Sequence, residues 1–131
     1  MQIKLTSVFV DDQDKALKFY TEVLGFQKKH EFQAGKYKWL TVVSQEEPDG
    51  VQLVLEHNEA YNPAAKASQQ EIFRHAIPAA NFFVADVQKE YERLKGNGVN
   101  FTKEPTKTTG STIAVLDDTC GNLIQITHLD W

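Results

Sequence analysis

Residues able to do acid–base or metal chemistry are scattered along this chain. The histidines are His30, His57, His75 and His128, and none belongs to a recognisable catalytic motif. Glu56 precedes His57, but neighbours on a β-strand point to opposite faces, so this carboxylate and imidazole do not form a catalytic pair on a strand. A histidine outside a motif is most often a surface or hydrogen-bonded residue. We therefore assign no catalytic residue from the sequence.

Cys120 is the only cysteine, so neither an internal disulfide nor a cysteine-based zinc site can form within one chain. It falls in a turn that runs from Asp117 to Asn122, where we expect an exposed thiol with no activating cation nearby in sequence. No glycine-rich phosphate loop and no serine nucleophile elbow is present. The cysteine content fits a reducing compartment, and we expect a cytoplasmic protein.

The stretch Ile3–Phe26 has the pattern of a strand, a capped helix and the turn into a second strand. Its first residues alternate and are rich in β-branched and aromatic types, as in a strand. Asp11 or Asp12 then offers a carboxylate to the first free helical N–H groups, and Gly25 supplies the left-handed stop. Apolar residues with helical spacing lie between them: Ala16, Leu17, Tyr20, Val23 and Leu24.

The same pattern occurs a second time in the chain. An offset of 74 residues places Asp12 on Asp86, which lies between a second strand and a second helix as the helix cap. Past the helices the offset becomes 71 residues, and Gly50 falls on Gly121 in a turn that precedes a strand. One such match would be weak, but the same order of elements occurring twice predicts a duplicated βαβββ unit.

We therefore predict an α+β fold in which residues 1–131 form a single domain of two βαβββ modules with curved sheets. Residues 1–57 form the first module and residues 79–131 the second. Residues 58–78 match nothing in the second module, and Asn62-Pro63 favours the start of a short helix, so this segment is predicted to be a linker. We expect a hairpin turn at Gln33–Gly35 and a loop at Thr106–Gly110.

Composition excludes several kinds of partner. The formal charge is −4 with 24% charged residues and no basic run, so no electrostatic footprint for nucleic acid or an anionic membrane exists. No apolar run approaches the roughly 18 residues of a membrane span, and the first residues enter a strand without a leader. We expect a soluble protein with no nucleic-acid and no membrane partner.

Each predicted helix must cover one face of its own sheet, which leaves the opposite face free to curve around a ligand as part of a cup. Alternation assigns twelve residues to these faces: Leu5, Ser7 and Phe9; Gln52, Val54 and Glu56; Ala79, Asn81 and Phe83; Leu123, Gln125 and Thr127. The candidate ligand-binding residues are Ser7, Trp39, Asn81, Phe83 and Gln125. The alternative is that the polar members are internally hydrogen-bonded and the aromatic members are core residues.

Three stretches carry a recognisable pattern: VFVDDQDKALKFYTEVLGF, FFVADVQKEYERLKGNGVNF and DDTCGNLIQITH. They resemble the vicinal oxygen chelate superfamily, which includes glyoxalase I, bleomycin-resistance proteins and extradiol dioxygenases. The resemblance covers nearly the whole chain. It implies paired βαβββ modules and a homodimer.

In metal-dependent members of that superfamily, four side chains bind a divalent ion. The resemblance places these positions on Leu5, Val54, Ala79 and Gln125, and only the Gln125 amide oxygen can act as a ligand. We therefore predict no metal and no other cofactor. A shift of two residues in strand register keeps the strand face and moves Glu56 to a ligand position. His75 would point to the same face as Ala79 if the strand began earlier, so the alternative metal set is Glu56, His75 and Gln125.

The preferred hypothesis is a glyoxalase-like homodimer that binds a small organic molecule in a cup between its modules without metal. The second hypothesis is a divalent-metal-dependent enzyme of the same superfamily, a lactoylglutathione-lyase-like lyase, an isomerase or a dioxygenase. A third is a protein-interaction module that binds no small molecule. The identity of the ligand does not follow from the sequence.

Overall fold

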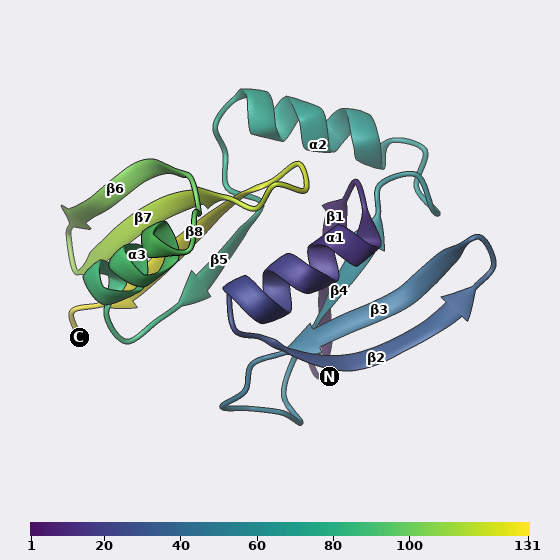
Figure 1. The fold of residues 1–131 in the computed structure, drawn as a ribbon, viewed down its shortest axis with the longest axis horizontal. Coiled ribbons are helices and arrows are strands. Elements are labelled where there is room, and N and C mark those ends of the chain that lie inside the picture. Colours follow the sequence, from purple (N-terminus) through teal and green to yellow (C-terminus); the bar gives the residue numbers. More distant parts are fainter. The chain divides into compact units, whose positions relative to one another are not determined.

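The computed structural model describes residues 1–131 and contains two four-stranded sheets (Figure 1). The chain divides into two units, Met1–Gln69 and Gln70–Trp131. The first contains β1 (Leu5–Val10), α1 (Gln13–Lys18) with a π-helical turn at Phe19–Val23, β2 (Gln27–Ala34), β3 (Tyr37–Val43) and β4 (Gln52–His57). Its strand order is β1-β4-β3-β2, with β1 parallel to β4 and the other pairs antiparallel.

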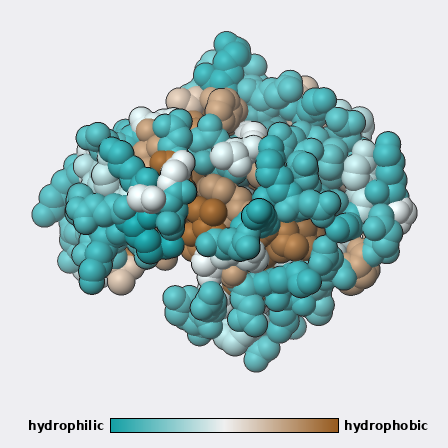
Figure 2. Space-filling view, viewed as in Figure 1, coloured by the Kyte–Doolittle hydropathy of each residue, from teal (hydrophilic) through white to brown (hydrophobic).

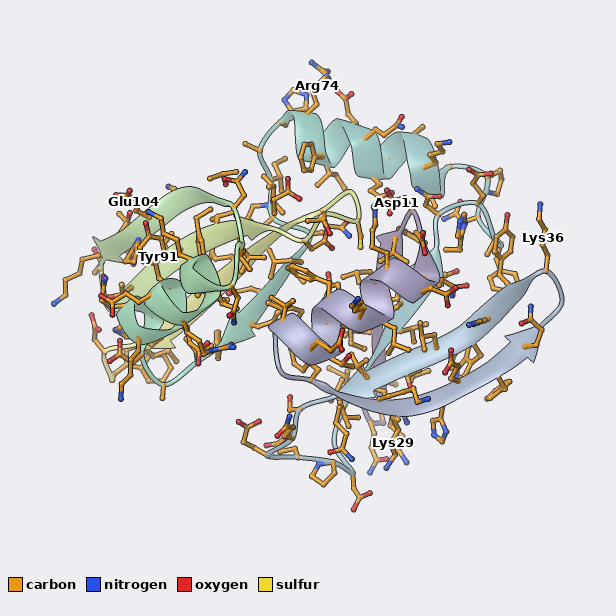
Figure 3. All side chains as sticks on the ribbon, in the orientation of Figure 1. Asp11, Lys29, Lys36, Arg74, Tyr91 and Glu104 are labelled. Atoms are coloured by element: carbon orange, nitrogen blue, oxygen red, sulfur yellow. The ribbon has the colours of Figure 1, made fainter.

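The second unit repeats this arrangement. It contains β5 (Ala80–Phe83), α3 (Val87–Gly96), β6 (Phe101–Thr108), β7 (Ser111–Asp117) and β8 (Leu123–Leu129), in the order β5-β8-β7-β6. The first strand is again parallel to the last, and the sheet is curved and open like the first. The predicted α+β fold of two βαβββ modules is therefore confirmed. The short helix expected in residues 58–78 is α2 (Ala65–Arg74), and Arg74 projects from its end (Figure 3).

The helix caps show how closely the repeats correspond. Asp12 accepts a hydrogen bond from the backbone N–H of Lys15 at 3.0 Å, and Asp86 accepts one from Lys89 at 3.1 Å. Both caps have a φ of −153°, which is extended backbone. Satisfying an otherwise unpaired N–H at a helix start stabilises the helix by about 1 kcal/mol. The sequence offset of 74 residues is thus an offset between equivalent structural positions.

In each unit the helix covers the sheet face opposite the predicted binding face. In the first unit, Val8, Val10 and Leu55 are almost completely buried, while Ser7 of β1 is exposed. In the second, the buried side chains on the helix face are Ala114, Leu116, Ile124 and Ile126. Alternation along the strands therefore leaves the Ser7 face and the Asn81 face without a covering helix from their own unit.

Two loop predictions are wrong in detail. The hairpin turn is Gly35–Lys36 rather than Gln33–Gly35, because β2 continues to Ala34 and Gly35 takes a φ of 70° that glycine adopts without strain. Lys36 projects from this hairpin tip (Figure 3). The expected loop at Thr106–Gly110 is mostly strand, since β6 runs to Thr108. Proline has no backbone N–H to donate to a neighbouring strand, but β6 is an edge strand with an irregular register near its proline and therefore accommodates this residue.

The expectation of an exposed Cys120 is also wrong, because its side chain is fully buried. The carboxylate of buried Asp118 accepts hydrogen bonds from the backbone N–H groups of Cys120 at 2.7 Å and of Asn122 at 3.0 Å. The Asn122 side-chain amide donates a third bond at 2.8 Å. These bonds fold the turn inwards and place the thiol in the interior.

Hydrophilic residues make up most of the surface seen in Figure 2, which fits the 24% of charged residues. None of the helices has the length and apolar character needed to cross a bilayer.

Candidate functional site

Three side chains on the uncovered face of the second unit form one hydrogen-bonded cluster. Asn81 on β5 and Gln125 on β8 are direct cross-strand partners. Thr127, two residues further along β8, donates its hydroxyl hydrogen to Asn81 Oδ1 at 2.7 Å and accepts a hydrogen bond from Gln125 Nε2 at 3.2 Å. The structure therefore brings together two of the five predicted ligand-binding residues and adds Thr127. We call Asn81, Gln125 and Thr127 the amide cluster.

Phe83 lies on the same face as the amide cluster. It is the cross-strand partner of Thr127, and its side chain is 60% exposed. The predicted alternative of a core aromatic residue is therefore wrong for Phe83. This face presents an aromatic ring next to polar amide groups, which is the usual chemistry of a site for small organic molecules.

The other two predicted residues lie on the uncovered face of the first unit. Ser7 is exposed on β1, and its hydroxyl makes no hydrogen bond within the chain. Trp39 on β3 is half-buried and stacks on Phe32 of β2 with 6.5 Å between ring centroids and 28° between ring planes. Phe32 is 57% exposed, so the aromatic pair carries an open ring surface. Ser7 and Trp39 lie on strands that β4 separates.

The four positions that bind metal in metal-dependent superfamily members do not fit an ion here. Leu5 is 47% exposed and Val54 only 7%, and both offer hydrocarbon alone. Ala79 has no donor side chain, and the Gln125 amide nitrogen is already bonded to Thr127. A catalytic ion generally needs at least three nitrogen, oxygen or sulfur ligands from the protein. This donor set supplies one neutral amide oxygen.

The alternative metal set does not gain support from the local structure. His75 does not lie on an extended segment before β5, because its backbone N–H bonds to Glu71 O at the end of α2 and Ala76 then turns with a φ of 57°. The strand-parity argument for this histidine therefore fails. Its Nε2 is 2.9 Å from the Glu71 carboxylate instead. No group of three or more His, Cys, Asp or Glu side chains has an arrangement that could hold a metal ion.

His57 and His128 occupy equivalent positions of the repeat, and both lie on the helix faces of their sheets. His128 Nδ1 accepts a hydrogen bond at 2.8 Å from the backbone N–H of Val87, the first residue of α3. His57 stacks on Tyr37, with ring centroids 4.4 Å apart, and its Nδ1 accepts a bond from the Glu59 N–H. Both imidazoles therefore have structural roles away from the uncovered sheet faces.

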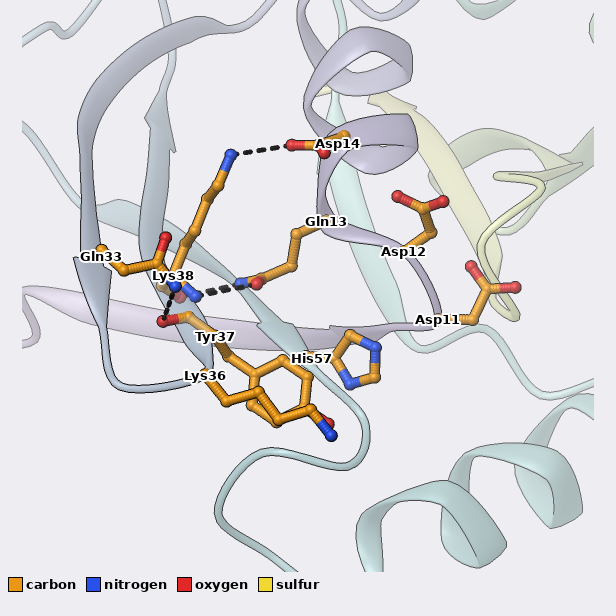
Figure 4. Close-up of a pocket in the computed structure, with 9 residues that line it drawn as sticks. All are labelled: Asp11, Asp12, Gln13, Asp14, Gln33, Lys36, Tyr37, Lys38 and His57. Carbon is orange, nitrogen blue, oxygen red and sulfur yellow. Dashed lines mark hydrogen bonds and ion pairs between the residues drawn. The ribbon is translucent and has the colours of Figure 1, made fainter.

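A pocket that the sequence did not predict lies at the start of α1 (Figure 4) and has a volume of about 370 Å³. It exists because β3 and β4 separate: they pair only at Thr41↔Val54 and Val42↔Leu53. Beyond this point the Gln13 amide bridges the strands, donating to Lys38 O at 2.8 Å and Leu55 O at 2.9 Å and accepting from Lys38 N at 3.0 Å. The equivalent residue of the second unit is Val87, and there β7 and β8 pair without interruption from Ser111↔Leu129 to Asp117↔Leu123.

Most of the charged groups of this pocket have a partner, either within the pocket or beside it. Lys38 Nζ lies 2.9 Å from Asp14 and 3.0 Å from Glu31. Both hydrogen bonds raise the pKa of Lys38, and the bond to Asp14 is the larger cause. Asp12 caps the helix, and Asp11 pairs with Lys15 at 3.2 Å. None of the five predicted ligand-binding residues lines the pocket. We interpret it as a solvated opening produced by the Gln13 bridge.

The fold and the repeated order of caps and turns agree with the family that the sequence matches. The family model described as Glyoxalase/Bleomycin resistance protein/Dioxygenase superfamily matches residues 2–126. The chain belongs to this superfamily, and the resemblance found in the sequence is confirmed.

Relatives of this chain share nearly its full length. YurT of Bacillus subtilis (strain 168) is 60% identical over 126 residues, covering 96% of this chain and 98% of YurT. The crystal structure of UcmS2 matches with a TM-score of 0.82 and 32% identity, over 100% of this chain and 98% of UcmS2. TnmS3, an antibiotic binding protein from Streptomyces sp. CB03234, matches with a TM-score of 0.78 and 26% identity, over 98% and 96% of the two chains.

Proposed function

We propose that this protein binds a small, planar organic molecule on the uncovered faces of its sheets, and that it does so without a metal ion. The observation that carries the proposal is the face of the second unit, where the 60% exposed Phe83 ring adjoins the amide groups of Asn81 and Gln125. Its ring supplies a stacking surface, and the amides supply directional hydrogen bonds. The likeness to TnmS3, an antibiotic binding protein, supports a binding role.

The donor set supports binding without metal. A hydrocarbon side chain cannot replace the hydration shell of a divalent ion, and three of the four family positions carry Leu5, Val54 and Ala79. Elemental analysis after dialysis, followed by nickel, zinc and iron titrations with thermal-shift detection, tests this expectation. Near-equimolar tight metal that is lost in Gln125→Ala would favour the alternative function, a metal-dependent lyase, isomerase or dioxygenase.

Ligand binding is tested with a panel of planar aromatic compounds, monitored by thermal shift and by native mass spectrometry of the purified protein. Once a ligand is found, Asn81→Leu and Gln125→Leu should each weaken its binding by about 1–3 kcal/mol, because a polar group of the ligand then loses its partner. Gln88→Leu on the exposed surface of α3 is the matched control, and its affinity should equal that of the wild type. Unchanged affinity in both site variants would place the ligand elsewhere.

The proposal extends to a cytoplasmic homodimer. The strands β1, β2, β5 and β6 are at the sheet edges, and large apolar side chains outside the proposed ligand site, including Ile3 and Ile77, are more than half exposed. Closed two-fold pairing with a second copy is the commonest assembly that covers such edges and side chains. Sedimentation at tens of micromolar tests this assembly, and a well-folded monomer would refute it. Cell fractionation tests the location.

A further inference from the structure

The hydrogen bonds of the amide cluster have a fixed direction. The Thr127 hydroxyl carries one hydrogen, which it donates to Asn81 Oδ1, so its oxygen is the acceptor for Gln125 Nε2. Thr127 is 4% exposed, and its β-branched side chain has few allowed rotamers. Both amides are thereby oriented by one buried hydroxyl group.

This direction decides which groups remain for a ligand. Asn81 uses its oxygen and keeps the Nδ2 hydrogens, whereas Gln125 uses its nitrogen and keeps Oε1; neither residue has another side-chain hydrogen bond within the chain. Asn81 is exposed and Gln125 is half-buried, so both groups are accessible. The two residues are direct partners on adjacent strands, which lie about 4.8 Å apart. One small group of a ligand can therefore contact a donor and an acceptor at the same time.

We infer that the site selects a planar ring bearing an adjacent hydrogen-bond acceptor and donor, the edge presented by a lactam or a cyclic imide. This inference rests on the proposed function. The ligand carbonyl accepts from Asn81 Nδ2, the ligand N–H donates to Gln125 Oε1, and the ring lies against Phe83 on the same sheet face. Thr127 is the positioning residue, since it touches the two amides and sets which of their groups is free.

The test compares two bicyclic probes of nearly equal shape: 2-quinolinone, a lactam, and coumarin, in which a ring oxygen replaces the N–H. Binding to the full-length protein is measured by titration with two-dimensional amide NMR spectra. We expect 2-quinolinone to bind about fivefold or more tightly than coumarin, because coumarin leaves Gln125 Oε1 facing an oxygen atom.

Variants separate the roles of the two amides. Gln125→Leu should weaken 2-quinolinone and remove its advantage over coumarin. Asn81→Leu should weaken both probes to a similar extent, because both carry the carbonyl. Each residue reaches the surface and is not in the core, so both variants are expected to fold.

The positioning role of Thr127 is tested with Thr127→Val, which removes the hydroxyl and keeps the shape, and with Thr127→Ser, which keeps the hydroxyl. Selectivity for the lactam should fall in Thr127→Val and persist in Thr127→Ser. If Thr127→Val does not fold, retained selectivity in Gln125→Leu decides against the inference on its own.

Equal affinity of the wild type for 2-quinolinone and coumarin would overturn the inferred donor and acceptor pattern and leave the proposed function standing. Absence of binding by either probe, while other planar compounds bind, would overturn it in the same way. Absence of binding by every planar compound in the panel would refute the proposed function together with this inference.

Discussion

The bridge made by Gln13 gives the sharpest prediction about stability. Its side chain is 8% exposed, and its amide makes three hydrogen bonds of 2.8–3.0 Å to backbone groups of Lys38 and Leu55. These backbone groups lie where β3 and β4 have separated, so no strand neighbour can replace the amide. Substituting Gln13→Met keeps the length of the side chain and removes all three bonds.

The expected loss is about 3 kcal/mol, because each of the three bonds contributes roughly 1 kcal/mol net. Unpaired backbone groups that water cannot reach would raise this value, and water entering from the pocket would lower it. For a chain of this size, such a loss corresponds to a decrease in the melting temperature of roughly 10 °C.

Urea denaturation followed by circular dichroism, together with a thermal melt, measures this loss. The matched control is Gln88→Met on the exposed surface of α3, where the change should stay within about 0.5 kcal/mol. Equal stability of Gln13→Met and Gln88→Met would refute the reasoning, since it would mean that the separated strands do not depend on the bridge.

Three further outcomes are expected. Cys120, being fully buried, should react with a thiol reagent only after the protein is denatured, and rapid labelling of the native protein would contradict the burial. Gln69→Met should reduce the free energy of unfolding by about 2 kcal/mol, because the buried Gln69 amide donates a hydrogen bond to Phe9 O and accepts one from Asn58. Gln70→Met, at an exposed position, is the control and should change the free energy of unfolding little. Hydrogen bonds from Lys28, the larger cause, and from Lys38 lower the folded-state pKa of Glu31. The contribution of Glu31 to the free energy of unfolding is therefore present above its unfolded pKa of about 4.3, and it is lost as the pH falls through the folded-state pKa. Glu31→Gln should therefore reduce the loss of unfolding free energy between pH 5 and pH 3, by less than about 1 kcal/mol for this partly exposed pair, and thermal melts at each pH would show a smaller decrease in melting temperature.

The sequence by itself determined the elements and their repetition. The caps at Asp12 and Asp86 and the left-handed stop at Gly25 are local features, because each depends on backbone groups within a few residues. The strand faces also follow from the sequence, since the alternation of side chains is fixed by the period of two. This is why Asn81, Phe83 and Gln125 could be assigned to one face before the structure was known.

The tertiary structure decided which of those residues act together. The direction of the amide hydrogen bonds depends on Thr127, and nothing in its local sequence distinguishes a hydroxyl that orients two amides from one that faces solvent. The Gln13 bridge was likewise not predictable, because it joins residues 25 and 42 positions apart along the chain. A local pattern records the propensities of neighbouring residues, whereas these contacts form only when strands distant in sequence are packed beside each other.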